Sequence, residues 1–256
     1  MKSYPVTTGD NGAWTGTLIF TEDKIEALVA TIKKLQIPPE LAVYLYYVSS
    51  GPSDKTPTVI ISPYYTGTEE AGKKIFAPFY AIGPITDTTA WLPYHNSNDG
   101  SNSFCIKGGR KPAFGVGLGQ TDPATGRSVW NSHKKFLQNP EAANSVVLVE
   151  AYSMGAARSF SLSSSAYAHR DTINFHVAVL PWYNNSSFDK QALAWGSQNR
   201  DLLRSTDMLD KNSTYINFAF ADPLETIYGT SLGRLKILKK RYDPFNRFGQ
   251  YFSLGK

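Results

Sequence analysis

Two neighbouring segments, residues 41–49 and 57–63, limit the possible folds of this chain more than any other feature. Both are rich in β-branched or aromatic residues, and prolines bound the second, as expected for short strands. The gap between them is of hairpin length, so we expect the two strands to pair antiparallel. Residues 145–152 and 172–183 are strongly apolar and predict two further buried strands. The chain is therefore expected to contain a mostly antiparallel sheet.

Helical patterns alternate with these strands. Ile25, Leu28 and Ile32 recur at the spacing of one helix face, after Thr21 as the expected N-cap and before a proline pair that ends the helix. Further helices are predicted over 68–76, 128–137, 188–205 and 223–241, further strands over 13–20 and 213–220, an extended segment over 78–85, and loops over 95–124. This order predicts an α+β fold, a large mostly antiparallel sheet backed by helices.

The composition is that of a globular chain and disfavours several classes of function. Of 256 residues, 41% are hydrophobic and 18% are charged, which is enough to bury a core. The net charge is +5, but the basic residues form no stripe along the sequence, so no nucleic acid partner is expected. The cluster of lysine and arginine residues at 236–241 is interpreted as a solvated helix end. No long apolar run predicts a membrane span, and the N-terminus has no signal-peptide pattern, so localisation stays open.

Familiar catalytic patterns are scarce. The four histidines lack metal-ligand spacing and Cys105 is the single cysteine, so no metal site is expected. The glycine-rich stretch 108–119 lacks the spacing of a phosphate-binding loop and is interpreted as a mobile surface loop over a pocket. In the triplet His169-Arg170-Asp171, the arginine and aspartate are expected to form a structural ion pair or contacts at the entry of a strand.

Tyr215 and Asn217 lie two residues apart in the predicted strand 213–220. Alternation along a strand puts both side chains on the same face, where a phenol and an amide side by side can line a site. Taken alone, this spacing is more often a packing feature than a functional one.

The C-terminal region carries several short motifs in a fixed order. They are Tyr-x-Asn-Phe at 215–218, Tyr-Gly at 228–229, Arg-Leu at 234–235, and Lys-x-Arg-Tyr-Asp-Pro-x-Asn-Arg-Phe at 239–248. Together they resemble the C-terminal signature of berberine bridge enzyme-like FAD-linked oxidases, within the vanillyl-alcohol oxidase superfamily. Upstream segments resemble fungal members of this group, namely Tyr4-Pro5, 104–112, 167–171 and 181–183. The resemblance covers almost the whole chain.

The resemblance implies a cofactor, FAD, and a small organic substrate held between the flavin and the sheet. Tyr215 is similar to the family's active-site base, which takes a proton from a substrate hydroxyl, or assists C–H cleavage, while hydride passes to the flavin. A phenolate base needs a nearby cation or hydrogen-bond donor, which the sequence does not identify. Asn217 is similar to the family's flavin-contacting amide, and Tyr242 and Asn246 are expected to help seat the flavin.

The resemblance also implies a domain organisation. Residues 1–212 are expected to form a substrate-binding domain, and residues 213–256 a berberine-bridge-type C-terminal segment of the same compact unit. The C-terminal helices are expected to dock on a flavin domain that precedes this region in the family and is expected to be absent here. Three interpretations stay open: the C-terminal part of an FAD-dependent oxidoreductase, a stand-alone non-redox domain that binds small molecules, or half of a split flavoenzyme with a separate flavin-domain chain.

Overall fold

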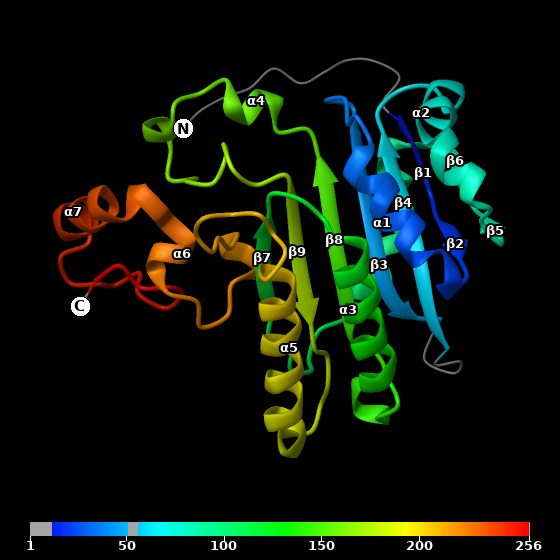
Figure 1. Cartoon of the computed structure of the whole chain (residues 1–256). Helices are drawn as coiled ribbons and strands as arrows, with labels where there is room; N and C mark the ends of the chain where they lie inside the picture. Colours follow the sequence, from blue (N-terminus) through cyan, green and yellow to red (C-terminus); the bar gives the residue numbers. More distant parts are fainter. Residues whose placement is uncertain (1–11, 51–55, 256) are drawn as a thin grey trace.

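The computed structural model describes residues 12–50 and 56–255. The Tyr4-Pro5 motif and most of the N-terminal segment, in which no signal-peptide pattern is expected, lie outside the described residues. A large antiparallel sheet runs through the molecule in the order β5-β2-β4-β3-β8-β9-β7, and β1 and β6 pair beside β4 (Figure 1). The strands are β1 (Gly12–Thr15), β2 (Leu18–Phe20), β3 (Leu41–Ser49), β4 (Pro57–Tyr65), β5 (Thr86–Asp87), β6 (Ala90–Pro93), β7 (Phe114–Leu118), β8 (Val146–Tyr152) and β9 (Phe175–Leu180).

Three helices cover one face of this sheet. They are α1 (Ile25–Lys34), α3 (Pro123–Phe136) and α5 (Asp189–Arg204), and they lie next to one another in front of the strands in Figure 1. The helix α2 (Glu69–Ile82) packs against α1 and β1, and the short α4 (Gly155–Arg158) lies in the connection from β8 to β9. The last two helices, α6 (Leu224–Tyr228) and α7 (Leu232–Tyr242), lie beyond the β7 edge of the sheet. The predicted α+β fold is confirmed.

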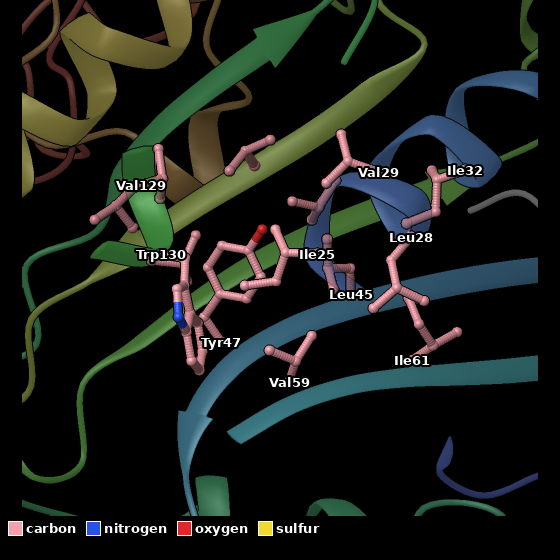
Figure 2. Close-up of a cluster of buried hydrophobic side chains, with 14 of the residues drawn as sticks. Ile25, Leu28, Val29, Ile32, Leu45, Tyr47, Val59, Ile61, Val129 and Trp130 are labelled. Carbon is pink, nitrogen blue, oxygen red and sulfur yellow. The ribbon is translucent and has the colours of Figure 1, made fainter. Parts of the chain in front are cut away.

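The hydrophobic core lies between these helices and the sheet. Figure 2 shows side chains of α1 and α3 meeting side chains of β3 and β4, including Ile25, Leu28, Val29, Ile32, Leu45, Tyr47, Val59, Ile61, Val129 and Trp130, all buried. The Tyr47 ring meets the Trp130 ring edge-on, with 5.2 Å between centroids. Because alternate residues of a strand point to opposite faces, the residues between these core positions must point away from the helices.

One core residue is titratable. His133 of α3 is fully buried among the rings of Tyr47, Trp130 and Trp195. Burial lowers its pKa to about 3, because the charged imidazolium would lose its hydration without gaining a counterion. His133 is therefore neutral in the folded protein and acts as a packing residue.

Most predicted elements agree with the structure, and the first correction concerns α2. This helix continues through the segment 78–85, predicted as extended, as far as Ile82, and it ends at Gly83 with φ 87°. Pro78 lies inside the helix and removes one backbone hydrogen bond, at a cost of about 3 kcal/mol. Phe76 and Phe79, on either side of Pro78, are both fully buried. Burial of two phenylalanine side chains stabilises the fold by at least as much free energy as the proline costs.

Three smaller corrections concern segment boundaries. Residues 13–20 form two strands, β1 and β2, instead of one. Thr21 precedes a short 3-10 helix (Glu22–Lys24) and its side chain caps nothing, so α1 begins at Ile25. The expected loop 95–124 contains the strand β7, two short 3-10 helices, and the start of α3.

Candidate functional site

The face of the sheet opposite the helices carries a group of polar and aromatic side chains. The strand register places Tyr44 of β3 beside Glu150 of β8, and Glu150 beside His176 of β9. Alternation puts Tyr46 and Tyr152 on the same face, two residues along their strands. His176 is buried and the other four side chains are half-buried. We call these five residues the polar face.

Tyr215 and Asn217 lie beside the polar face, in a turn instead of the predicted strand. Tyr215 has an extended backbone and Ile216–Phe218 form a 3-10 helix; we call residues 215–218 the Tyr215 turn. The Asn217 side-chain amide donates a hydrogen bond to the Tyr215 hydroxyl, with 2.8 Å between Nδ2 and the oxygen. The strand prediction for 213–220 is wrong because the chain curls at Ile216, and this curl itself brings the phenol and the amide together.

Two glycines of β7 allow the Tyr215 turn to lie directly on the sheet. All five residues of β7 are buried, so the interpretation of 108–119 as a mobile surface loop is wrong for this part. A Cβ atom on Gly115 would lie 2.6 Å from the carbonyl oxygen of Phe218, and one on Gly117 would lie 2.6 Å from the hydroxyl of Ser213. At Gly115 the obstacle to a Cβ atom is mainly the backbone of Phe218, and at Gly117 it is the side chains of Ile173 and Ser213. Close packing, not an unusual dihedral angle, therefore favours glycine at both positions.

His176 connects the Tyr215 turn to the polar face. Its ring lies edge-on to the Tyr215 ring, with 5.4 Å between centroids, and stacks on the Tyr152 ring at 5.5 Å. The Tyr167 hydroxyl lies 3.3 Å from His176 Nε2. Burial lowers the pKa of His176 to about 4, so the imidazole is neutral near pH 7. It therefore supplies no positive charge to Tyr215, whose observed donor is the Asn217 amide.

A buried carboxylate anchors the segment that carries the turn. The Asp222 side chain accepts hydrogen bonds from Thr214 at 3.3 Å and from Arg204 of α5 at 3.0 Å, and it pairs with Arg200 at 3.4 Å. The backbone N–H of Phe220 donates to the other carboxylate oxygen at 3.1 Å. Both ends of the Tyr215 turn are thereby tied to α5, which packs on β7.

A second anchor holds the loop that places Tyr167. The guanidinium of Arg170 is buried and donates to backbone carbonyls of residues 157, 160 and 167 and to the hydroxyls of Ser164 and Ser165. Asp171 is exposed, and within the described part of the chain it forms no ion pair with Arg170. Of the two alternatives expected for Arg170, the structure therefore shows the second, contacts at the entry of the strand β9.

The polar face contains a carboxyl group in an unusual state. Burial raises the pKa of Glu150 to about 6, and no cation counteracts this effect. The pKa of Tyr44 is raised by burial and, secondarily, by the Glu150 carboxylate, and the same two causes raise the pKa of Tyr152. The phenols of the polar face are therefore neutral hydrogen-bond donors and acceptors, and Glu150 is the carboxylate that lies among them.

Tyr242 and Asn246 lie in a separate group at the C-terminal end of α7. The Tyr242 ring is 72% exposed. Asn246 holds the C-terminal tail as a loop, because it donates to the carbonyl of Gly255 at 3.1 Å and accepts from the hydroxyl of Ser253 at 3.2 Å. Within the described residues no hydrogen bond joins either side chain to the Tyr215 turn. The tail still touches that turn through the Tyr251 hydroxyl, which donates to the Ile216 carbonyl at 3.3 Å.

Sequence reasoning missed Glu150, Tyr152 and His176 as site residues. The signal was present in the predicted strand 145–152, where the polar Glu150 and Tyr152 interrupt an apolar run at every second position. Polar residues with a period of two in a strand indicate a second face that is not core. No cluster of metal-ligating side chains occurs among residues 12–50 and 56–255. In the same ranges, no helix is long and apolar enough to span a membrane.

The same fold occurs in solved structures. The chain superposes on berberine bridge enzyme-like protein 28 from Arabidopsis thaliana with a TM-score of 0.75 and 12% identity, covering 95% of this chain and 56% of the other. At this level of identity, the likeness shows the fold alone. No protein-family model matches the sequence.

The sequence relatives of the chain are FAD-linked oxidoreductases of fungi. The chain is 28% identical over 249 residues to the FAD-linked oxidoreductase anuG of Penicillium roqueforti, covering 91% of this chain and 49% of anuG. It is 28% identical over 255 residues to the FAD-linked oxidoreductase OXR1 of Pyricularia oryzae, covering 95% and 50%. The chain is thus similar to fungal FAD-linked oxidoreductases, and its fold is that of berberine bridge enzyme-like proteins. It spans about half the length of the curated relatives it matches.

Proposed function

We propose that this chain forms the substrate-binding face of an FAD-dependent oxidase, in which Tyr215 is the base that accepts a proton from a small organic substrate while a hydride passes to the flavin. The observation that carries the proposal is the 2.8 Å hydrogen bond from Asn217 to the Tyr215 hydroxyl. It supplies the donor that a phenolate base requires, on the face of the sheet that carries the other polar groups.

The surroundings of the Tyr215 oxygen support the base role. A hydrogen bond donated to this oxygen stabilises the phenolate more than the phenol, because the phenolate is the stronger acceptor. The edge of the Tyr215 ring packs on neutral His176, which holds the ring without competing for the proton. The donor and the packing together fix the phenol beside the polar face, where a substrate hydroxyl or C–H group can meet it.

The residues present fit a flavin. The Asn217 side chain is exposed, and its second N–H and its carbonyl oxygen remain for a ligand. An amide that offers both a donor and an acceptor suits the edge of an isoalloxazine ring, which carries both kinds of group. When bound, FAD supplies the hydride acceptor. We also propose that Tyr242 and Asn246, within segment 213–256, belong to the surface that contacts the flavin-binding part of the enzyme.

Exposed aromatic residues support this second assignment. Phe245 and Phe248 in the tail after α7 are 82% and 86% exposed, and Ile237 on α7 is 69% exposed. Large apolar side chains that are exposed within one short stretch of a chain are typical of a surface that another part of a protein covers. The helices α6 and α7 lie beyond the β7 edge, so the covering part would also adjoin the Tyr215 turn (Figure 1).

The base role is tested in a flavin-loaded enzyme that contains this chain, by stopped-flow measurement of flavin reduction. Tyr215→Phe removes the proton acceptor and keeps the ring, so we expect reduction to slow by roughly 100-fold or more while the flavin absorbance is retained. Tyr94→Phe is the matched control, because Tyr94 is 68% exposed and lies after β6, away from the polar face. An unchanged rate in Tyr215→Phe would rule out the base role.

A further inference from the structure

The chain after α7 forms a loop that lies against the Tyr215 turn. The loop starts at Asp243, whose carboxylate accepts hydrogen bonds from the side chain of Lys239 on α7 and from the backbone N–H groups of Arg247 and Phe248. The Lys239 ammonium also donates to the Phe248 carbonyl at 2.8 Å, so the chain turns back after α7 (Figure 1). We call residues 243–255 the C-terminal strap.

Hydrogen bonds at both ends give the C-terminal strap a defined conformation. The hydrogen bond from Lys239 is the main cause that lowers the pKa of Asp243 to about 2, so this carboxylate is ionised at neutral pH. At the other end, the Asn246 side chain binds Ser253 and Gly255. Phe252 has φ 44°, in the left-handed region. An aromatic residue keeps this conformation only where the surrounding contacts fix it.

The side chain of Tyr251 joins the C-terminal strap to the Tyr215 turn. Its hydroxyl lies 3.3 Å from the carbonyl oxygen of Ile216 and 3.4 Å from that of Ala219. These carbonyls belong to the first residue of the 3-10 helix and to the residue that ends it. A 3-10 helix of three residues has poor hydrogen-bond geometry, and its last carbonyls have no partner within the helix. A donor from outside the turn therefore stabilises it.

The other contacts of the Tyr215 turn act at different places. Gly115 of β7 meets the turn at Phe218, and Asp222 binds Thr214 and the N–H of Phe220, outside the 3-10 helix. Within residues 12–50 and 56–255, Tyr251 supplies the one side-chain donor to the carbonyls of Ile216 and Ala219. The phenol and the amide of the turn lie on the segment that this donor holds.

We propose that Tyr251 is a positioning residue, and that the C-terminal strap holds the Tyr215 turn in the geometry that brings the Asn217 amide 2.8 Å from the Tyr215 hydroxyl. This inference rests on the proposed function, because the base role of Tyr215 gives the positioning its consequence for the reaction. The strap also contains Asn246, which belongs to the surface proposed to contact the flavin-binding part of the enzyme. The strap thereby joins that surface to the base through one short segment.

The first test uses the full chain without flavin, labelled with 3-fluorotyrosine and observed by fluorine NMR. The Tyr215 resonance is identified by its loss in Tyr215→Phe. Tyr251→Phe removes the donor and keeps the ring, so we expect the Tyr215 resonance to shift or broaden. Hydrogen exchange of the Ala219 amide, which donates to the Ile216 carbonyl at 3.2 Å, should accelerate roughly fivefold, as the loss of one neutral hydrogen bond predicts. Amides of α5 should keep their protection.

A control and a second variant make this result specific. Tyr94→Phe removes an exposed hydroxyl after β6 and should change neither signal. Asp243→Asn loosens the other end of the strap and should act in the same direction as Tyr251→Phe. Both changes release the same contact, so the double variant should exchange the Ala219 amide little faster than the stronger single variant. An unchanged Tyr215 resonance in Tyr251→Phe, or effects that multiply in the double variant, would overturn the proposal.

The second test measures the consequence for the reaction in the flavin-loaded enzyme. With the substrate used for Tyr215→Phe, Tyr251→Phe should slow the limiting rate of flavin reduction roughly fivefold to tenfold and change the substrate dissociation constant less than about twofold. A role in overall stability alone would leave the limiting rate of the folded enzyme unchanged, and that result would refute the positioning role. The signals of the flavin-free chain do not depend on the base role, which Tyr215→Phe tests separately.

Discussion

Gly115→Ala should displace the Tyr215 turn while leaving the sheet intact. The added Cβ would lie 2.6 Å from the Phe218 carbonyl oxygen and 2.7 Å from the Phe218 Cβ, both parts of a second chain segment that cannot rotate away. Ordinary contact begins at 3.4 Å, so the turn must move by about 0.8 Å. A misplacement of about 1 Å costs roughly 100-fold in rate when a catalytic group is involved, whereas the strain should lower stability by about 1–3 kcal/mol.

Two measurements separate displacement from unfolding. Hydrogen exchange of the Phe218 amide, which donates to the Tyr215 carbonyl at 2.9 Å, should accelerate in the isolated Gly115→Ala chain, while amides of α5 stay protected. Flavin reduction in the loaded enzyme should slow by one to two orders of magnitude. Gly233→Ala is the control, because a Cβ there meets nothing within 4 Å. If Gly115→Ala left both the Phe218 exchange and the reduction rate unchanged, the positioning role of β7 would be refuted.

Three further predictions concern stability, measured by urea unfolding. The pKa of His133 is held near 3, below its unfolded value of 6.5, so stability should fall by up to about 1.4 kcal/mol per pH unit from pH 6.5 toward 3, and His133→Leu should flatten this slope. Asp222→Asn should cost about 3–5 kcal/mol because it removes the buried carboxylate that two half-buried arginines share, whereas Asp201→Asn, at an exposed position near the same arginines, should cost less than about 1 kcal/mol. Glu150→Gln should stabilise the chain at pH 8 and lose this effect below pH 4.5, because the folded pKa near 6 exceeds the unfolded one and only the ionised carboxylate is penalised.

The layers of the fold could be predicted because they depend on local patterns. Apolar runs with β-branched residues specify β3, β8 and β9, and the 3.6-residue spacing of Ile25, Leu28 and Ile32 specifies α1. The strand β7 could not be found in this way. Gly115 and Gly117 have low strand propensity and resemble loop residues. Their presence in a strand is explained by segments distant in the sequence that pack on them, Phe218 of the Tyr215 turn on Gly115, and Ile173 with Ser213 on Gly117.

The candidate site likewise has parts that local sequence predicts and parts that depend on distant segments. Tyr215 and Asn217 were selected by their motif and an expected strand geometry, and the structure brings them together through a 3-10 turn instead. Tyr242 and Asn246 were selected by motif alone, and they lie at the end of α7 and in the tail, where their proposed role depends on a covering partner. Glu150 was not predicted as a site residue, because the apolar run around it indicates a buried strand. A charged side chain in such a strand nevertheless indicates that the face of the sheet opposite the core is not packed with apolar residues.

The polar face is the part of the sheet where the sequence differs most from that of a simple apolar core. Helices cover one side of the sheet with apolar side chains, and the strands could be equally apolar on the other side if it were simply packed. Instead, Tyr44, Glu150 and His176 lie in one row across three strands, and the pKa values of Glu150 and His176 are both shifted by burial in the direction that disfavours charge. The row therefore carries an energetic cost in the folded chain, and Glu150→Gln should remove part of this cost at pH 8, where the carboxylate is ionised.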